Sequence, residues 1–167
     1  MIENKVAKSG LITLDLMDFV RDKELATIDI KEQLWQGLAL KEKDFRAFIA
    51  NNNWSKYHGM FVGVYCSADA IIPHWAYMLL VTALKPFAYQ VFFGNENELK
   101  QKIILDAIQQ INPNDYVDAR VIVKGCGDID LTPDAYLNLA NKLQPVVKSL
   151  MYGEPCSTVP IYKKPKS

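Results

Sequence analysis

The feature that most constrains the fold is a regular alternation of two kinds of segment after residue 56. Short runs rich in Val, Ile, Phe and Tyr are typical of buried strands, and the longer runs between them are typical of helices. The strand-like segments are residues 57–65, 88–93 and 119–125. The helix-like segments are residues 73–84, 95–111 and 132–153. This order predicts parallel strands joined by right-handed crossovers.

Proline and threonine residues predict where two of these helices begin and where one is interrupted. Pro73 stands at or near the first turn of its helix. Thr132 is a candidate N-cap, and Pro133 occupies the first helical position, where its missing N–H costs nothing. Pro145 lies inside the last segment, so we expect it to kink or break that helix and let the second half turn back.

The N-terminal third is less regular than the rest of the chain. Residues 11–16, "LITLDL", alternate apolar and polar side chains and predict an edge strand. Asp29 and Glu32 have the spacing of a capping box, which predicts a short helix that runs through Leu38. Residues 41–50 predict a second helix with one aromatic face.

Length and composition place these elements in one domain. The chain has 167 residues, half of them hydrophobic, which is enough for one full core. We therefore predict a single domain over residues 1–167. Its expected fold class is a layered α/β domain with a mainly parallel sheet, helices on the faces of that sheet and an irregular, helical N-terminal third.

Charge and hydropathy exclude some partners. Lys plus Arg and Asp plus Glu are both 19, which argues against a nucleic-acid binder that acts by neutralising phosphates. No apolar stretch is long enough to span a bilayer, so we expect no membrane partner. The first ten residues carry no apolar signal region, and we expect a cytoplasmic protein.

Three cysteines are the candidate functional residues. Cys66 follows the first strand-like segment and Cys126 follows the third. If those strands share one parallel sheet, both thiols lie at its carboxyl edge, where open α/β sheets bind ligands. Cys156 would join them if the helix broken at Pro145 brings the tail back. Each thiol is flanked by Gly, Pro, Ser or Asp, as in loops, and the alternative is that the cysteines are packed as small hydrophobes.

A metal site is the leading interpretation of these thiols, and it implies zinc or iron as the cofactor. Two further side chains are candidates to complete such a site, Asp69 and His74, because these metals take carboxylate and imidazole ligands together with thiolates. Each has another explanation, since Asp69 could be a helix N-cap and His74 a polar surface group. Asp128 is another candidate and could equally be a turn residue.

Two alternatives belong to other classes of function. Cys66 precedes a predicted helix, where the helix dipole favours a thiolate nucleophile, so the chain could be a thiol enzyme. A cysteine phosphatase would need arginine at position 72, which is Ile72 here. Residues 75–84 are apolar almost all round, so this helix is covered either by the N-terminal helices or by a second copy of the chain. The second arrangement predicts a homodimeric interaction module.

Four stretches carry a resemblance to a known family. They are residues 29–49, residues 66–79, "VIVKGCGD" at 121–128 and "MYGEPCSTVPIYK" at 151–163. In them the chain resembles a bacterial family called domain of unknown function 2480. The resemblance implies no reaction, but it implies an association with the sulfur-mobilisation machinery of iron–sulfur cluster assembly. It thereby implies an accessory protein with iron–sulfur assembly proteins as partners.

Overall fold

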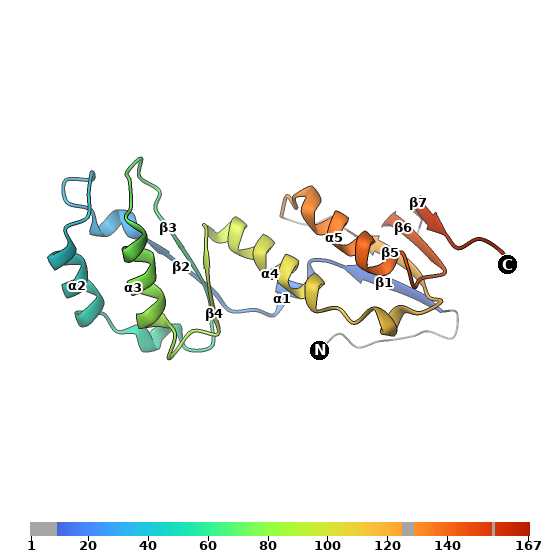
Figure 1. The fold of residues 1–167 in the computed structure, drawn as a ribbon, viewed down its shortest axis with the longest axis horizontal. Helices are drawn as coiled ribbons and strands as arrows, with labels where there is room; N and C mark the ends of the chain where they lie inside the picture. The colour runs from blue at the N-terminus through green and yellow to red at the C-terminus, as the bar shows by residue number, and fades with distance from the viewer. Residues whose placement is uncertain (1–9, 125–128, 155) are drawn as a thin grey trace. The chain divides into compact units, whose positions relative to one another are not determined.

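The chain has a mixed α/β fold. A computed structural model describes residues 10–124, 129–154 and 156–167. The described part contains seven strands in two sheets, together with five α-helices (Figure 1). By its internal contacts the chain divides into two compact units, residues 23–100 and residues 1–22 with 101–167.

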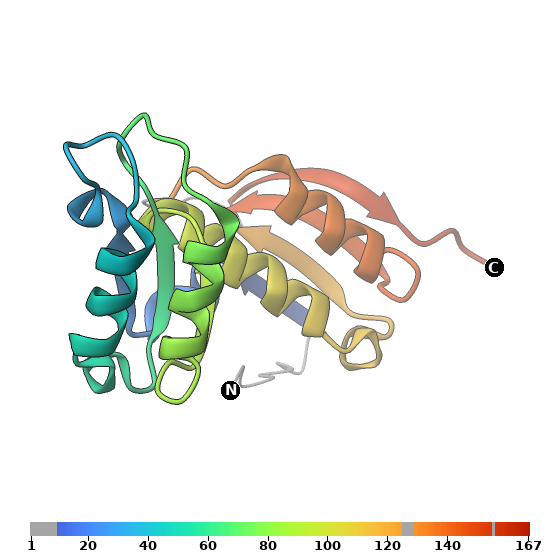
Figure 2. The same cartoon turned by 60° about the vertical axis from the view of Figure 1, so that its left-hand side comes forward.

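Residues 23–100 form a three-stranded, fully parallel sheet. Its strands are β2 (Leu25–Asp29), β3 (Phe61–Tyr65) and β4 (Gln90–Phe93), in the order β2-β3-β4. The helices of this unit are α2 (Glu42–Asn51) and α3 (His74–Leu84), which lie side by side in both overall views (Figure 2). Two single turns of 3₁₀ helix, η1 (Ile30–Gln33) and η2 (Trp54–Tyr57), complete it.

The core of this unit forms where α2 and α3 meet one face of the sheet. Val62 and Val64 of the central strand lie on that face and are buried. Helix α3 contributes a stripe spaced by four residues, Ala76, Leu80 and Leu84, and all three are inaccessible to solvent. A strand between two others in a parallel sheet needs cover on both faces, which explains the continuous apolar run in β3.

The other face of β3 explains why a glycine stands in the middle of a buried strand. A Cβ atom built on Gly63 would lie 2.6 Å from the carbonyl oxygen of Gly94. The missing side chain therefore lets the connection after β4, and the buried Leu99 that follows it, approach the sheet closely. Gly63 thus sets the position of the first turn of α4 (Glu96–Gln110) within this unit.

The second unit contains a four-stranded sheet in the order β1-β5-β6-β7. Its strands are β1 (Leu11–Asp15), β5 (Arg120–Lys124), β6 (Ser149–Glu154) and β7 (Ser157–Lys163). The first three are parallel, and β7 pairs with β6 in the antiparallel sense. Its helical segments are α1 (Asp18–Arg21), the end of α4, η3 (Pro113–Tyr116) and α5 (Pro133–Leu143).

Helices α4 and α5 are linked within this second unit. The Lys142 side chain donates to the backbone carbonyls of Ile108 and Gln109, at the end of α4. The buried residues of α5, Leu139 and Leu143 among them, are spaced by four and lie on one face of the helix. Thr132 occupies the predicted N-cap position with Pro133 directly after it, although the Thr132 side chain makes no capping bond.

Three sequence-based expectations are corrected. The predicted strands do not share one sheet, because β3 belongs to the three-stranded sheet and β5 to the four-stranded one. The helix expected through Leu38 is only the turn η1, which Asp29 caps as predicted. The helix from Pro133 ends at Leu143, and the chain after Pro145 forms strand β6 instead of a second helical half.

The structure also bears on the expected edge strand and on the expected absence of a membrane-spanning helix. Residues 11–16 contain an edge strand as predicted, since β1 ends the strand order of its sheet. Within the described residues, no helix is long and apolar enough to cross a membrane. The single domain over residues 1–167 remains a prediction.

Candidate functional sites at the carboxyl edges of the two sheets

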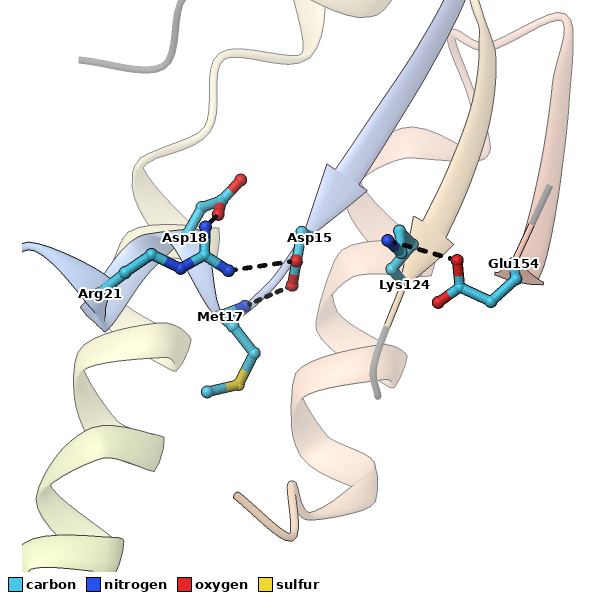
Figure 3. Close-up of polar contacts among 6 residues, drawn as sticks. All are labelled: Asp15, Met17, Asp18, Arg21, Lys124 and Glu154. Atoms are coloured by element: carbon cyan, nitrogen blue, oxygen red, sulfur yellow. Dashed lines mark hydrogen bonds and ion pairs between the residues drawn. The ribbon is translucent and has the colours of Figure 1, made fainter. Parts of the chain in front are cut away.

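The parallel strands of the four-stranded sheet all end in charged residues. Asp15, Lys124 and Glu154 are the last residues of β1, β5 and β6, and Figure 3 shows them at one edge. Asp15 and Lys124 are register partners. The Lys124 ammonium lies 3.3 Å from a carboxylate oxygen of Glu154 and so joins the ends of β5 and β6. This edge is where parallel sheets commonly bind ligands.

Asp15 also fixes the turn that leaves β1. One carboxylate oxygen accepts from the Met17 amide at 3.0 Å, and the other lies 3.4 Å from the Arg21 guanidinium (Figure 3). Arg21 additionally pairs with Asp18 within α1. Each basic side chain drawn here thus has an acidic partner, and paired surface charges contribute little stability. At this edge they link the ends of β5 and β6 to each other and the end of β1 to α1.

Cys156 lies at this same edge. It comes two positions after Glu154, at the turn into β7, and its side chain is exposed. Two residues of chain span at most about 7 Å, so the thiol stays close to the end of β6. The sequence argument required a returning helix, whereas a sixth strand parallel to β5 delivers Cys156 instead. Cys126 and Asp128 lie outside the described residues.

Cys66 follows β3 at the carboxyl edge of the three-stranded sheet. Its half-buried thiol donates to the carbonyl of Ala68 at a sulfur–oxygen distance of 3.7 Å. The sequence-based argument placed Cys66 and Cys126 at one edge because it assumed one sheet. Strands β3 and β5 belong to different sheets, so that argument fails, and the shared thiol site is left as a prediction.

Asp69 and His74 are both exposed. Asp69 is not the N-cap of α3, because Pro73 occupies that position and His74 begins the helix. Across the described residues, no three His, Cys, Asp or Glu side chains gather closely enough to hold a metal ion. Cys66, Asp69 and His74 therefore do not form a three-ligand cluster.

Cys66 lines a pocket that the sequence did not predict. The pocket has a volume of about 470 Å³. It is lined by the ends of β3 and β4, the loop after β3, the start of α3 and the first turn of α4. Its lining residues include Cys66, Ser67, Tyr77, Phe93, Asn95 and Glu98.

A carboxylate holds one rim of this pocket. Asp29, at the end of β2, accepts from the Ser67 hydroxyl at 2.6 Å and from the Ser67 amide at 3.0 Å. Its Oδ1 also accepts from the Lys31 amide at 2.9 Å. Burial acts to raise the pKa of Asp29, but these hydrogen bonds outweigh it and bring the pKa below the ordinary value of 3.8. The sequence indicated Asp29 as a cap, but it gave no signal for the bond to Ser67, 38 positions away.

The opposite wall begins with a reciprocal cap. The Asn95 amide donates to Glu98 Oε2 at 2.8 Å, and the Glu98 amide donates to Asn95 Oδ1 at 3.0 Å. This is a capping-box arrangement, and the spacing in "NENE" is the sequence signal that could have revealed it.

A second pocket lies in the other unit and has a different character. It has a volume of about 420 Å³ and is lined almost entirely by apolar and aromatic side chains of α5 and strands β5 to β7. Tyr136 and Tyr152 meet edge to face at its side, with ring centroids 5.6 Å apart. No charged side chain is among its described lining residues.

Comparison with known proteins gives a family but no activity. The family model described as "Protein of unknown function (DUF2480)" matches residues 1–164. No curated protein and no solved structure shows significant similarity to the chain.

Proposed function

The chain belongs to the DUF2480 family of proteins of unknown function, and from its residues we propose that it is a cytoplasmic accessory protein whose cysteines bind a metal. The metal is zinc or iron, alone or as part of an iron–sulfur centre. The partners in this proposal are proteins of iron–sulfur cluster assembly, as the family resemblance in the sequence implies.

The parallel pairing of β5 with β6 is the observation that carries the proposal. The register joins Val123 to Tyr152, so the two strands end side by side, and the pair Lys124–Glu154 links their last residues. Cys156 follows one of these ends and is exposed. An exposed thiol at the carboxyl edge of parallel strands is accessible to an incoming metal or to a partner protein.

The chemistry of the available side chains fits a thiophilic metal. Cys126 and Cys156 supply thiolates, and Asp128 supplies a carboxylate, a combination that zinc and iron both accept. Cys66 follows a strand of the three-stranded sheet, and within the described residues it forms no three-ligand group with Asp69 and His74. The proposal therefore assigns the metal to Cys126 and Cys156 and leaves Cys66 as the internal control.

The test is the metal content of protein purified without oxygen and without added metal. We expect about one equivalent of zinc or iron per chain in the unmodified protein and in Cys66→Ser. Cys126→Ser and Cys156→Ser should each lose most of that metal. An unmodified protein without zinc or iron would refute the proposal, as would a Cys156→Ser variant that keeps its full metal content.

A thiol enzyme that uses Cys66 is the second candidate, because this cysteine lines a pocket of its own. The same preparations discriminate between the two. Metal-free protein in which Cys66 alone reacts fast with iodoacetamide favours the enzyme. Metal-free protein in which all three cysteines react slowly with iodoacetamide favours an interaction module that neither binds metal nor uses a thiol in catalysis.

Self-association through α3 is part of the proposal. Helix α2 covers one side of α3, where Phe45 meets the Trp75 ring edge to face at 5.8 Å. Met78 and Val81 remain exposed on α3, Met78 by 69%. A homodimer would bury these two side chains in a two-fold contact. Light scattering over a dilution series should give the mass of two chains, and Met78→Lys with Val81→Lys should restore the mass of one.

A further inference from the structure

The Cys66 pocket offers a binding site of a different kind from the proposed metal site. All of its lining residues belong to residues 23–100. It lies beyond the carboxyl ends of parallel strands, has room for a small organic molecule and combines aromatic walls with a few polar groups. The charge and hydrogen bonding of these groups determine which class of ligand fits.

Charge excludes an anion. Glu98 is the one carboxylic acid among the described lining residues, and no Lys or Arg is among them. The first turn of a helix usually attracts anions through its free amides. Here the Glu98 carboxylate and the Asn95 side chain already accept from two of those amides. An incoming anion would therefore meet the Glu98 carboxylate at a helix start where two amides are already occupied.

Glu98 retains acceptor capacity toward the pocket. Its Oε2 accepts from the Asn95 amide, while no hydrogen bond to Oε1 occurs among the described residues. The capping bond holds the carboxylate in position before any ligand arrives, which lowers the entropy that binding must overcome. Asp29 adds a second negative charge at the same edge, on the far side of Ser67.

Two aromatic rings face the same space. Tyr77 of α3 and Phe93 of β4 meet edge to face, with ring centroids 5.5 Å apart. Phe93 is 59% exposed although it ends a strand, so a ligand that covers its ring would bury apolar area. The Tyr77 hydroxyl has no hydrogen-bond partner among the residues that the structure describes. Aromatic faces next to a carboxylate attract organic cations.

We propose that this pocket binds a small organic cation, an amine or quaternary ammonium compound with an apolar or aromatic body. The cationic head lies against the Glu98 carboxylate, and the body lies against Tyr77 and Phe93. The half-buried Cys66 thiol lines the same pocket and is covered when the ligand binds.

The experiment follows alkylation of Cys66 by iodoacetamide, with mass spectrometry of the peptide that contains it. Benzyltrimethylammonium is the probe, phenylacetate its anionic counterpart and benzyl alcohol the neutral one. We expect benzyltrimethylammonium to slow alkylation of Cys66 in a saturable manner, and phenylacetate to have no effect. Benzyl alcohol should protect at least about fivefold more weakly than the cation, because it lacks the charge.

Two variants test the assignment of residues. Glu98→Gln keeps an amide oxygen for the cap but removes the charge, so it should weaken benzyltrimethylammonium binding about fivefold. Phe93→Leu should weaken it by a similar factor through loss of the ring. Glu96→Gln is the matched control, because Glu96 lies in the same helical turn, pairs with Lys100 and does not line the pocket.

Three results would overturn the inference. Benzyltrimethylammonium could fail to protect Cys66 from alkylation, or phenylacetate could protect it equally well. The third result is that Glu98→Gln and Glu96→Gln weaken benzyltrimethylammonium binding to the same extent. The test does not depend on the metal proposal, because metal content and Cys66 protection are read on different cysteines.

Discussion

Two of the three strands in the three-stranded sheet end in aromatic residues, Tyr65 and Phe93, whereas every parallel strand of the four-stranded sheet ends in a charged one. The two edges share a position in their folds and differ in chemistry. Aromatic strand ends, together with a capped helix, make the walls of a pocket. The charged ends of β5 and β6 pair with each other, Asp15 at the end of β1 pairs with Arg21, and Cys156 is exposed beside them. A common topology thus supplies a location for a site, and the strand-end residues decide what it can bind.

The largest effects should come from the cores beneath the two edges. Leu80 in α3 and Leu139 in α5 are both buried under helices that cover their own sheets. Replacing either by alanine should lower the free energy of unfolding by about 2–5 kcal/mol. Urea titrations followed by circular dichroism measure this loss.

The same pair of variants tests whether the two units unfold together. All three tryptophans, Trp35, Trp54 and Trp75, lie in residues 23–100, so tryptophan fluorescence reports on that unit. If residues 1–167 form one cooperative domain, Leu139→Ala should shift the fluorescence transition as far as Leu80→Ala does. A fluorescence transition that Leu139→Ala leaves unchanged would contradict the single domain.

Replacing Gly63, which lies against the Gly94 carbonyl, should give the next largest loss in the free energy of unfolding. Gly63→Ala places a Cβ atom 2.6 Å from the backbone oxygen of Gly94, which cannot move without shifting the first turn of α4. We expect a loss of about 1–3 kcal/mol in unfolding free energy and a change in the rate of Cys66 alkylation. A variant within about 0.5 kcal/mol of the unmodified protein would show that this contact does not fix the pocket wall.

Asp29→Ala should lower the free energy of unfolding by about 1 kcal/mol, because it leaves the amides of Lys31 and Ser67 without their acceptor. Asp69→Ala is the control, since Asp69 is exposed near the same edge. Equal losses in the two variants would argue against a structural role for the Asp29 hydrogen bonds.

The contribution of Asp29 should also depend on pH. Its pKa in the folded protein lies below the ordinary 3.8, so folding favours the ionised form. The extra stability relative to Asp29→Asn is therefore fully present above pH 3.8 and disappears as the pH falls through the folded-state pKa. Unfolding free energies measured from neutral pH downward check the sign, and a difference that grows on acidification would contradict it.

The smallest effect should come from the ion pair that joins β5 to β6. Lys124 and Glu154 are both partly exposed, and a double-mutant cycle of Lys124→Met and Glu154→Gln should give a coupling of at most about 1 kcal/mol. High salt should reduce that coupling. A larger, salt-independent coupling would mean that this edge is better shielded from water than its exposure indicates.

Local sequence patterns predicted the elements between residues 57 and 143 well. Strands β3, β4 and β5 and helices α3 and α4 coincide with the expected segments within a few residues, and α5 begins at Pro133 as expected. The reason is physical, since helical and strand periodicities and the positions of Pro73 and Pro133 are properties of neighbouring residues. The resemblance to the family was confirmed over residues 1–164.

Pairing between distant strands could not be predicted in the same way. The apolar residues after Pro145 fit a helical period and a strand period equally well. Only their pairing with β5 makes residues 149–154 strand β6. Strand β2 was not predicted, because its five residues, LATID, do not strictly alternate apolar and polar side chains, and its pairing with β3 involves residues far along the chain. No local pattern shows that β3 and β5 belong to different sheets, so the argument that places Cys66 and Cys126 at one edge rests on a wrong assumption. Likewise, no local pattern brings Tyr77 of α3 next to Phe93 of β4.

The most direct test of the central claim is a cobalt titration of the metal-free protein and its three single Cys→Ser variants. Thiolate ligands give cobalt(II) a charge-transfer absorption in the near ultraviolet, and tetrahedral coordination gives a strong visible band. The account predicts that both bands survive in Cys66→Ser and that the charge-transfer absorption falls in Cys126→Ser and Cys156→Ser. A charge-transfer absorption that disappears in Cys66→Ser but persists in Cys156→Ser would contradict the assignment of the metal to the four-stranded sheet.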